Sequence, residues 1–372
     1  MKLKDRSEEL QVVESPLYRE LERERDEKNR VIKKIKKEVG QYKKLFSLLS
    51  DEFHREKPSI KTKSYVLPKK ETRINESAVL LLSDMHSDIP VKSERVQGYE
   101  DYNWNACCHR AQRLVDTTIS HLCENMTSYN FPELWVMVMG DNTSGEIHDL
   151  KRHSEWQNSF KSSMYTGALI ASMLEDFARY FPVVKVVCVS GNHPRRSTRV
   201  DWKAPLENFD YLTMMYAKSK LQGYVKEGRM EFVIPDAWSV CVDIRGYNFL
   251  ISHGHQSRQN SLGLPYYGLE RKSRRMISLG AKKGITYNYF VQGHQHTQAS
   301  IEHPTGELIM NGAFLATDEY VFEEKSGVNE PSQLLFGVHD DYGASWRMPI
   351  NLRVKNWEKK EKERPSRYNI EI

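Results

Sequence analysis

Short apolar runs alternate with longer amphipathic segments through the middle of the chain. The runs lie at residues 78–82, 134–139 and 183–189, and the segments at 104–125 and 154–180 have the spacing of helices. Alternation of strands and helices favours a layered α/β sheet with crossover helices. The sequence therefore predicts an α/β core in this region.

After residue 230 the apolar runs become shorter. They lie at residues 232–234, 239–244 and 247–252, and runs of this length are expected of antiparallel strands. Together the two regions predict a sandwich of two sheets.

Residues 14–56 have a different pattern. From Val31 to Phe53 the apolar side chains recur at steps of three and four residues, which places them on one stripe of a helix. The other faces of this helix are filled with Lys, Arg and Glu. Such a stripe can close on another copy of the chain, on a partner protein or on the body of the protein.

These patterns divide the chain into four parts. We predict a charged helical arm at 1–57, a linker at 58–77, the main domain at 78–350 and a charged C-terminal tail at 351–372. The tail, rich in Lys and Glu, is expected to be solvated.

The composition indicates the class of protein and its expected location. Of its 372 residues 39% are hydrophobic and 28% charged, no apolar stretch is long enough to cross a bilayer, and the N-terminal residues are highly charged. We therefore expect no membrane span, no secretion signal and a cytoplasmic location. The five cysteines have no paired spacing and are expected to be reduced thiols, with Cys188 and Cys241 buried in strands. A net charge of +5 permits a nucleic-acid partner without proving one.

Five short stretches rich in histidine and aspartate each follow an apolar run. A buried strand that ends in metal-binding side chains indicates a site at one edge of a sheet. A single stretch would be weak evidence, whereas an ordered set of five is specific. The stretches are Asp84-Met85-His86, Gly140-Asp141, Gly191-Asn192-His193, His253-Gly254-His255 and Gly293-His294-Gln295-His296.

These residue types suit a pair of divalent ions that share a carboxylate, and Asp141 could bridge them. A mixed shell of nitrogen and oxygen favours manganese, iron, zinc or cobalt over magnesium alone. Such ions polarise phosphoryl oxygens and turn a bound water into hydroxide, which attacks phosphorus in line. His193 follows the proposed ligand Asn192 and is placed to donate a proton to the leaving oxygen.

The order of these motifs resembles that of the calcineurin-like metallophosphoesterase family over about residues 78–320. The resemblance implies a two-sheet αββα sandwich that holds two divalent ions. We expect these ions to be manganese, with iron, zinc, cobalt or magnesium as the alternatives. The resemblance implies one ion held by Asp84, His86, Asp141 and His296. It implies a second held by Asp141, Asn192, His253 and His294, with His193 as the catalytic histidine.

Two positions depart from the family pattern. Many relatives have Asp or Arg three residues after the bridging aspartate and an acidic residue after the Gly-Asn-His motif, where this chain has Ser144 and Pro194. The metal ligands are unaffected. However, His193 then lacks an obvious acidic partner to orient it, and Glu146 is the candidate substitute.

The substrate is predicted from the flanking residues. Basic side chains beside aromatic ones suit a polynucleotide, and we assign substrate binding to Arg195, Arg196, Arg199 and His255. The same arginines could equally hold one terminal phosphate. A second basic cluster spans residues 271–283, but it could simply be the solvated face of a helix whose Leu269, Met276 and Leu279 pack inward. The aromatic side chains are Trp202, Tyr266, Tyr267, Tyr287 and Tyr289.

The leading hypothesis is a metal-dependent phosphodiesterase that cleaves DNA or RNA. The basic helical arm is similar in general arrangement to that of SbcD-type repair nucleases, although glutamates nearly balance its charge. The alternatives are a phosphomonoesterase acting on a phosphoprotein or nucleotide, and a scaffold subunit that has lost turnover.

Overall fold

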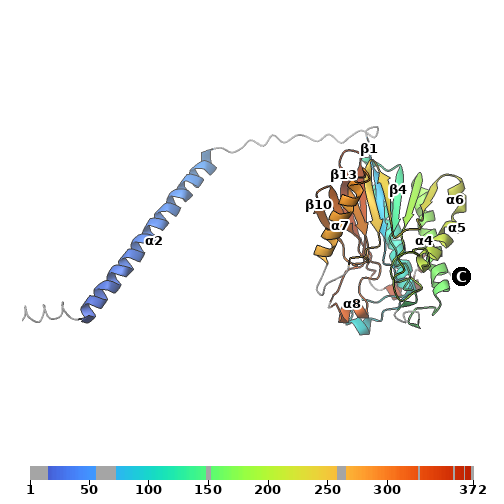
Figure 1. Cartoon of the computed structure of the whole chain (residues 1–372), viewed down its shortest axis with the longest axis horizontal. Helices are drawn as coiled ribbons and strands as arrows, with labels where there is room; N and C mark the ends of the chain where they lie inside the picture. Colours follow the sequence, from blue (N-terminus) through green and yellow to red (C-terminus); the bar gives the residue numbers. More distant parts are fainter. Residues whose placement is uncertain are drawn as a thin grey trace, which may run out of the picture. The chain divides into compact units, whose positions relative to one another are not determined.

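The computed structural model describes residues 16–55, 73–147, 152–257, 265–325, 327–354, 357–363 and 365–369. The chain divides into two compact units, Met1–Leu67 and Pro68–Ile372. The first unit contains one long helix, α2 (Pro16–Arg55), in the segment whose apolar stripe predicts a helix (Figure 1). Val31, Ile35 and Val39 of this stripe are about half exposed. The side chains of Phe46, Leu49 and Phe53 lie outside the described residues.

Six strands of the second unit form the first sheet, in the order β13-β12-β2-β4-β5-β6. The four strands from β2 to β6 are parallel, and β12 and β13 are antiparallel additions at one side. Every residue of β2 is buried, as expected for a parallel strand covered on both faces. The strands are β2 (Ser77–Leu82), β4 (Glu133–Val138), β5 (Val183–Cys188), β6 (Met230–Val233), β12 (Ser332–His339) and β13 (Gly343–Asn351).

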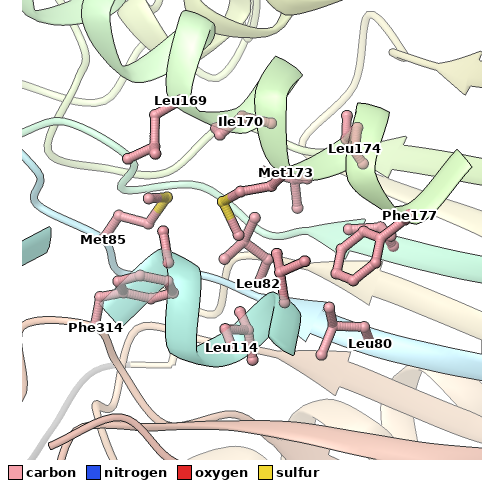
Figure 2. Close-up of a cluster of buried hydrophobic side chains, with 14 of the residues drawn as sticks. Leu80, Leu82, Met85, Leu114, Leu169, Ile170, Met173, Leu174, Phe177 and Phe314 are labelled. Carbon is pink, nitrogen blue, oxygen red and sulfur yellow. The ribbon is translucent and has the colours of Figure 1, made fainter. Parts of the chain in front are cut away.

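Helices α3 (Trp104–Ile119) and α4 (Ser159–Tyr180) connect the parallel strands, and each begins at an asparagine whose side chain accepts a backbone hydrogen bond. They cover the first sheet with a large apolar layer. In Figure 2, Leu80 and Leu82 of β2 meet Leu114 of α3 and Met173 of α4 in this layer.

The second sheet has five strands in the order β10-β11-β9-β8-β7. The pair β7–β8 is antiparallel, as predicted, but β8 and β9 are parallel because helix α7 (Tyr266–Ala281) lies between them in the chain. The expectation for residues 232–234 was wrong, since β6 joins the first sheet in parallel with β5. The strands are β7 (Ser239–Ile244), β8 (Tyr247–Ser252), β9 (Tyr289–Gln292), β10 (Ala299–His303) and β11 (Gly306–Met310).

The two sheets pack face to face through a second apolar cluster that includes Val79, Met137, Phe249 and Phe336. Helix α7 covers the outer face of the second sheet, and α4 lies on the opposite side of the second unit (Figure 1). The layers therefore follow the order helix, sheet, sheet, helix, and the predicted αββα sandwich is confirmed.

Shorter elements complete the described part of the chain. They are β1 (Ile74–Asn75), which pairs with β3 (Tyr129–Asn130), a 3₁₀ turn at Ser93–Val96, a π-helical turn at Ser120–Asn125, α5 (Phe209–Lys220), α6 (Gln222–Lys226), α8 (Glu319–Glu323) and α9 (Trp357–Glu363). No described helix is both long and apolar enough to cross a membrane. Cys188 is buried as expected, but Cys241 is exposed because its strand β7 lies at the edge of the sheet.

The C-terminal segment differs from its predicted solvated state. Tyr368 is only 3% exposed, and its hydroxyl donates a hydrogen bond of 2.5 Å to Asp176 of α4. Glu361 of α9 pairs with His109 of α3 at 2.6 Å. The segment packs because one aromatic and several paired charges anchor an otherwise polar stretch to α3 and α4.

The change Tyr368→Ala should lower the free energy of unfolding by about 3 kcal/mol, because it removes a buried ring and a hydrogen bond. Urea denaturation measures this loss. The matched control is Tyr342→Ala, which removes a tyrosine that is 75% exposed and should change stability by less than about 0.5 kcal/mol. Equal effects of the two variants would contradict an anchoring role.

Candidate metal centre

The predicted ligands lie at the carboxyl ends of strands from both sheets. In the first sheet, Leu82 pairs with Val138 and Val138 with Cys188, so the loops after β2, β4 and β5 leave the sheet at one edge. Strands β8 and β9 of the second sheet are also parallel, so the loops that follow them leave that sheet at one edge. At this edge they meet the loops of the first sheet. The site therefore spans the seam between the sheets.

Two groups of side chains converge at this edge. Within each group the potential ligand atoms all lie within 4.8 Å of one another. His253 joins the second group to Asn192, whose Oδ1 is 2.9 Å from the Nε2 of the histidine. All seven predicted ligands are thus brought to one place. The first group is Asp84, His86 and His296, and the second is Asp141, His253 and His294.

The backbone at these positions is strained. Among the described residues eight nonglycine residues have positive φ, and five of them are predicted ligands. A left-handed backbone is unfavourable for residues with a Cβ and tends to occur where function requires it. This conformation provides the turn that allows Asp84 and His86 to face the same point. The five are Asp84 (55°), His86 (41°), Asp141 (54°), His294 (69°) and His296 (52°).

Two glycines allow the carboxylates to lie directly against the backbone. A Cβ at Gly191 would collide with the carboxylate of Asp141, and one at Gly293 with that of Asp84. These two positions therefore require glycine, because a side chain would not fit between the backbone and the carboxylate.

The ionisation states of the group fit cation ligands. Burial alone would raise the pKa of Asp84, but the hydrogen bond and charge of His296 outweigh it and lower the pKa to about 2. Burial lowers the pKa of His86 to about 3, and also lowers that of His294 to about 3. Ionised carboxylates and neutral imidazoles are the forms that bind metal ions.

His253 is oriented toward the site by the backbone. Its Nδ1 lies 2.7 Å from the carbonyl oxygen of Met139, so Nδ1 donates there and Nε2 faces Asp141 at 3.0 Å. Burial opposes the charged form of His253, yet the charge of Asp141 raises its pKa to about 9. The proton on His253 thus balances a buried carboxylate, a role that a bound cation would take over. The donor set fits divalent ions.

His193 lies beside this group. Its backbone N–H donates to Asp141 Oδ1 at 2.8 Å, and its ring is 5.0 Å from that of His86. Its Nδ1 is buried and has no hydrogen-bond partner among the described residues. Burial lowers the pKa of His193, opposed by the charge of Asp141. Glu146, the candidate orienting acid, accepts a hydrogen bond from Ser159 of α4 at 3.1 Å.

A buried aspartate that the sequence did not single out supports the loops. Asp210 in the first turn of α5 accepts hydrogen bonds from the backbone N–H groups of Asp141 (3.0 Å), Asn142 (3.1 Å) and Gly191 (2.9 Å). Burial and the nearby charge of Asp141 raise its pKa to about 6. Asp88 acts similarly, accepting from the backbone N–H of the unusual Ser144 at 2.8 Å. The only sequence signal for Asp210 was an acid near a helix start, which is common.

The predicted substrate residues differ in their surroundings. The guanidinium of Arg195 donates to the carbonyl oxygens of Ser197 (3.0 Å) and Thr198 (2.9 Å), so it shapes its own loop. Arg196 and Arg199 are exposed on that loop.

His255 is half-buried and stacks on Trp202, with ring centroids 5.5 Å apart and an angle of 10° between the planes. Its ring also lies 5.7 Å from that of His253. The structure therefore places His255 beside the second ligand group.

The basic cluster of α7 is mostly the solvated face of the helix. Leu269 is buried and Met276 packs beneath the helix, as the simpler interpretation holds, but Leu279 is 54% exposed. Arg274 pairs with Glu270 of the same helix at 2.7 Å. Lys272 is an exception, because it is half-buried and donates to Gln256 at 2.8 Å.

Comparison with known proteins gives no family assignment. No family model and no curated protein sequence matches the chain. Solved structures that align with it include a predicted phosphoesterase from Streptococcus pneumoniae, with 8% identity over 74% of this chain and 98% of that one and a TM-score of 0.29. A novel archaeal phosphodiesterase aligns with 10% identity over 73% and 99% of the chains and a TM-score of 0.33.

Vacuolar protein sorting 29 from Cryptosporidium parvum aligns with 12% identity over 74% of this chain and 98% of that one, with a TM-score of 0.32. TM-scores this low do not support a conclusion about fold or function.

The change Asp210→Asn should weaken Mn²⁺ binding by roughly 10- to 100-fold, because the loops of Asp141 and Gly191 lose a shared acceptor. Isothermal titration calorimetry on folded protein measures the affinity. The exposed Asp236→Asn is the control and should bind normally. Normal affinity in Asp210→Asn would mean that this carboxylate does not position the ligands.

Proposed function

We propose that this protein is a phosphoester hydrolase of the calcineurin-like metallophosphoesterase type that uses two divalent ions, with manganese as the preferred metal. The observation that carries the proposal is the convergence of two Asp/His ligand groups on left-handed backbone at one edge of the sandwich. When bound, the ions would polarise the phosphoryl oxygens and lower the pKa of the attacking water.

The side chains have distinct roles in this proposal. Asp84, His86 and His296 would hold one ion, and His253 and His294 with the Asn192 amide oxygen would hold the other, with Asp141 shared. The buried carboxylates Asp84 and Asp141 supply the negative charge that retains the ions. His193, anchored through its backbone N–H to Asp141, would protonate the leaving oxygen.

The finer proposal is a phosphodiesterase that cleaves DNA or RNA. It is supported by the exposed Arg196 and Arg199, which follow His193 in the chain, and by the exposed rings of Trp202 and Tyr267. Cations hold a phosphate backbone, and exposed aromatic rings can stack with bases. The likeness of the N-terminal arm to that of SbcD-type nucleases stays a prediction.

The change Asp141→Asn should abolish Mn²⁺-dependent cleavage of labelled DNA and RNA oligonucleotides, because the shared ligand loses its charge. Gel electrophoresis of the products measures cleavage. Asp236→Asn is again the control, with normal activity expected. Release of phosphate from monoesters without cleavage of any oligonucleotide would contradict the nuclease proposal and favour a phosphomonoesterase.

The change His193→Gln should lower the rate of oligonucleotide cleavage by roughly 100-fold or more, because the alkoxide leaving group needs a proton. The loss should be much smaller on bis-p-nitrophenyl phosphate, because nitrophenolate leaves without protonation. Rates on the two substrates at saturating Mn²⁺ measure this difference. Equal losses on both would assign His193 a role other than that of general acid.

A further inference from the structure

A cavity of about 200 Å³ lies between α7 and the outer face of the second sheet. Leu250 of β8 and Phe290 of β9 form part of its floor, and Leu269 and Met276 of α7 form part of its roof. Successive residues of a strand point to opposite faces of a sheet. Ser252 of β8 therefore lines this cavity, while the next residue, His253, turns to the metal centre.

One part of the cavity wall is aromatic and lies near the metal centre. Trp202 and Trp238 line it, and the ring of His255 lies 5.5 Å from the first and 5.2 Å from the second. Trp238 Nε1 donates to the carbonyl oxygen of Trp202 at 3.2 Å, which ties the two rings together. The ring of His255 also lies 6.4 Å from that of His294, so one imidazole lies near both the aromatic wall of the cavity and the second ligand group.

Polar side chains also line the cavity among its apolar walls, and two of them, Gln292 and Lys272, carry nitrogen donors suited to a ligand. Gln292 is 2% exposed, and its Nε2 has no hydrogen-bond partner among the described residues. Lys272 directs its ammonium group to Gln256 at 2.8 Å, and burial lowers its pKa to about 8. A buried donor without an acceptor is unfavourable. A ligand that carries a hydrogen-bond acceptor would satisfy the Gln292 donor.

We propose that this cavity binds one nucleobase of the substrate, a flat ring with carbonyl or ring-nitrogen acceptors, while the adjoining phosphate lies at the metal centre. The inference rests on the proposed function and narrows its substrate to nucleotide diesters. The volume is below the roughly 300 Å³ at which pockets for larger ligands begin, so it suits a single base. A polynucleotide would enter as a single strand or with one base turned out of the stack.

The test separates base binding from catalysis. Equilibrium dialysis of the full chain with labelled uridine, which has no phosphate, measures binding directly, with ribose as the matched ligand. Hydrolysis of thymidine 5′-(p-nitrophenyl phosphate) and methyl p-nitrophenyl phosphate with Mn²⁺ compares two diesters that share a leaving group. We expect uridine but not ribose to bind, and kcat/KM to be roughly 10-fold or more higher for the nucleoside ester.

Filling the cavity should remove both effects. Met276→Trp places a larger side chain in the roof, far along the chain from the metal ligands, and should lose uridine binding and the preference for the nucleoside ester. Its rate on the methyl ester should stay that of the wild type. Leu279→Trp, on the exposed part of the same helix, should keep both properties. Lys272→Met removes a donor at similar length and should weaken uridine binding at least 10-fold, which keeps the test valid if Met276→Trp does not fold.

The outcomes distinguish the two proposals. If neither ester is hydrolysed but the wild type binds uridine and the cavity variants do not, the proposed function fails and the base site stands. Failure of the wild type to bind uridine, or uridine binding that is unchanged in the folded cavity variants, overturns the inference whatever the activity. Equal kcat/KM for the two esters in the wild type also overturns it.

Discussion

The structure depends on how the negative charges of two buried carboxylates are balanced by nearby groups. Asp84 and Asp141 are almost completely inaccessible to solvent and ionised, and a buried charge without a partner is strongly unfavourable. His296 and His253 lie 3.4 Å and 3.0 Å from them. The positions of the surrounding loops follow from the need to keep these charges paired.

That need explains why both sheets are required. The carboxylates follow strands of the first sheet, whereas His253 and His294 follow strands of the second. The apolar cluster between the sheets therefore does more than stabilise the fold, because it sets the distance between acid and histidine. The carboxylate of Asp210 also supports the site, because it accepts hydrogen bonds from the backbone of two ligand loops.

The two faces of β8 and β9 belong to two different proposed sites, the metal centre and the cavity under α7. Residues that point inward lead to the metal ligands, and those that point outward, such as Ser252 and Gln292, line the cavity under α7. His255 and Trp202 lie where the two regions meet. Because successive residues of a strand point to opposite faces of the sheet, the same two strands lead to the metal ligands on one face and line the cavity on the other.

The family resemblance implied the αββα layers, and the sequence pattern by itself determined a sandwich of two sheets and the identity of the residues that gather at the sheet edge. It could do so because strand hydrophobicity and the ligand types that end each strand are local properties. It missed Asp210, the exposure of Cys241, the docking of Tyr368 and the internal hydrogen bonds of Arg195. The first three depend on how distant segments of the chain pack, whereas the hydrogen bonds of Arg195 depend on the conformation of its own loop. Only the tertiary structure decided such contacts, because burial and hydrogen-bond partners far along the chain leave no periodic signal in the sequence.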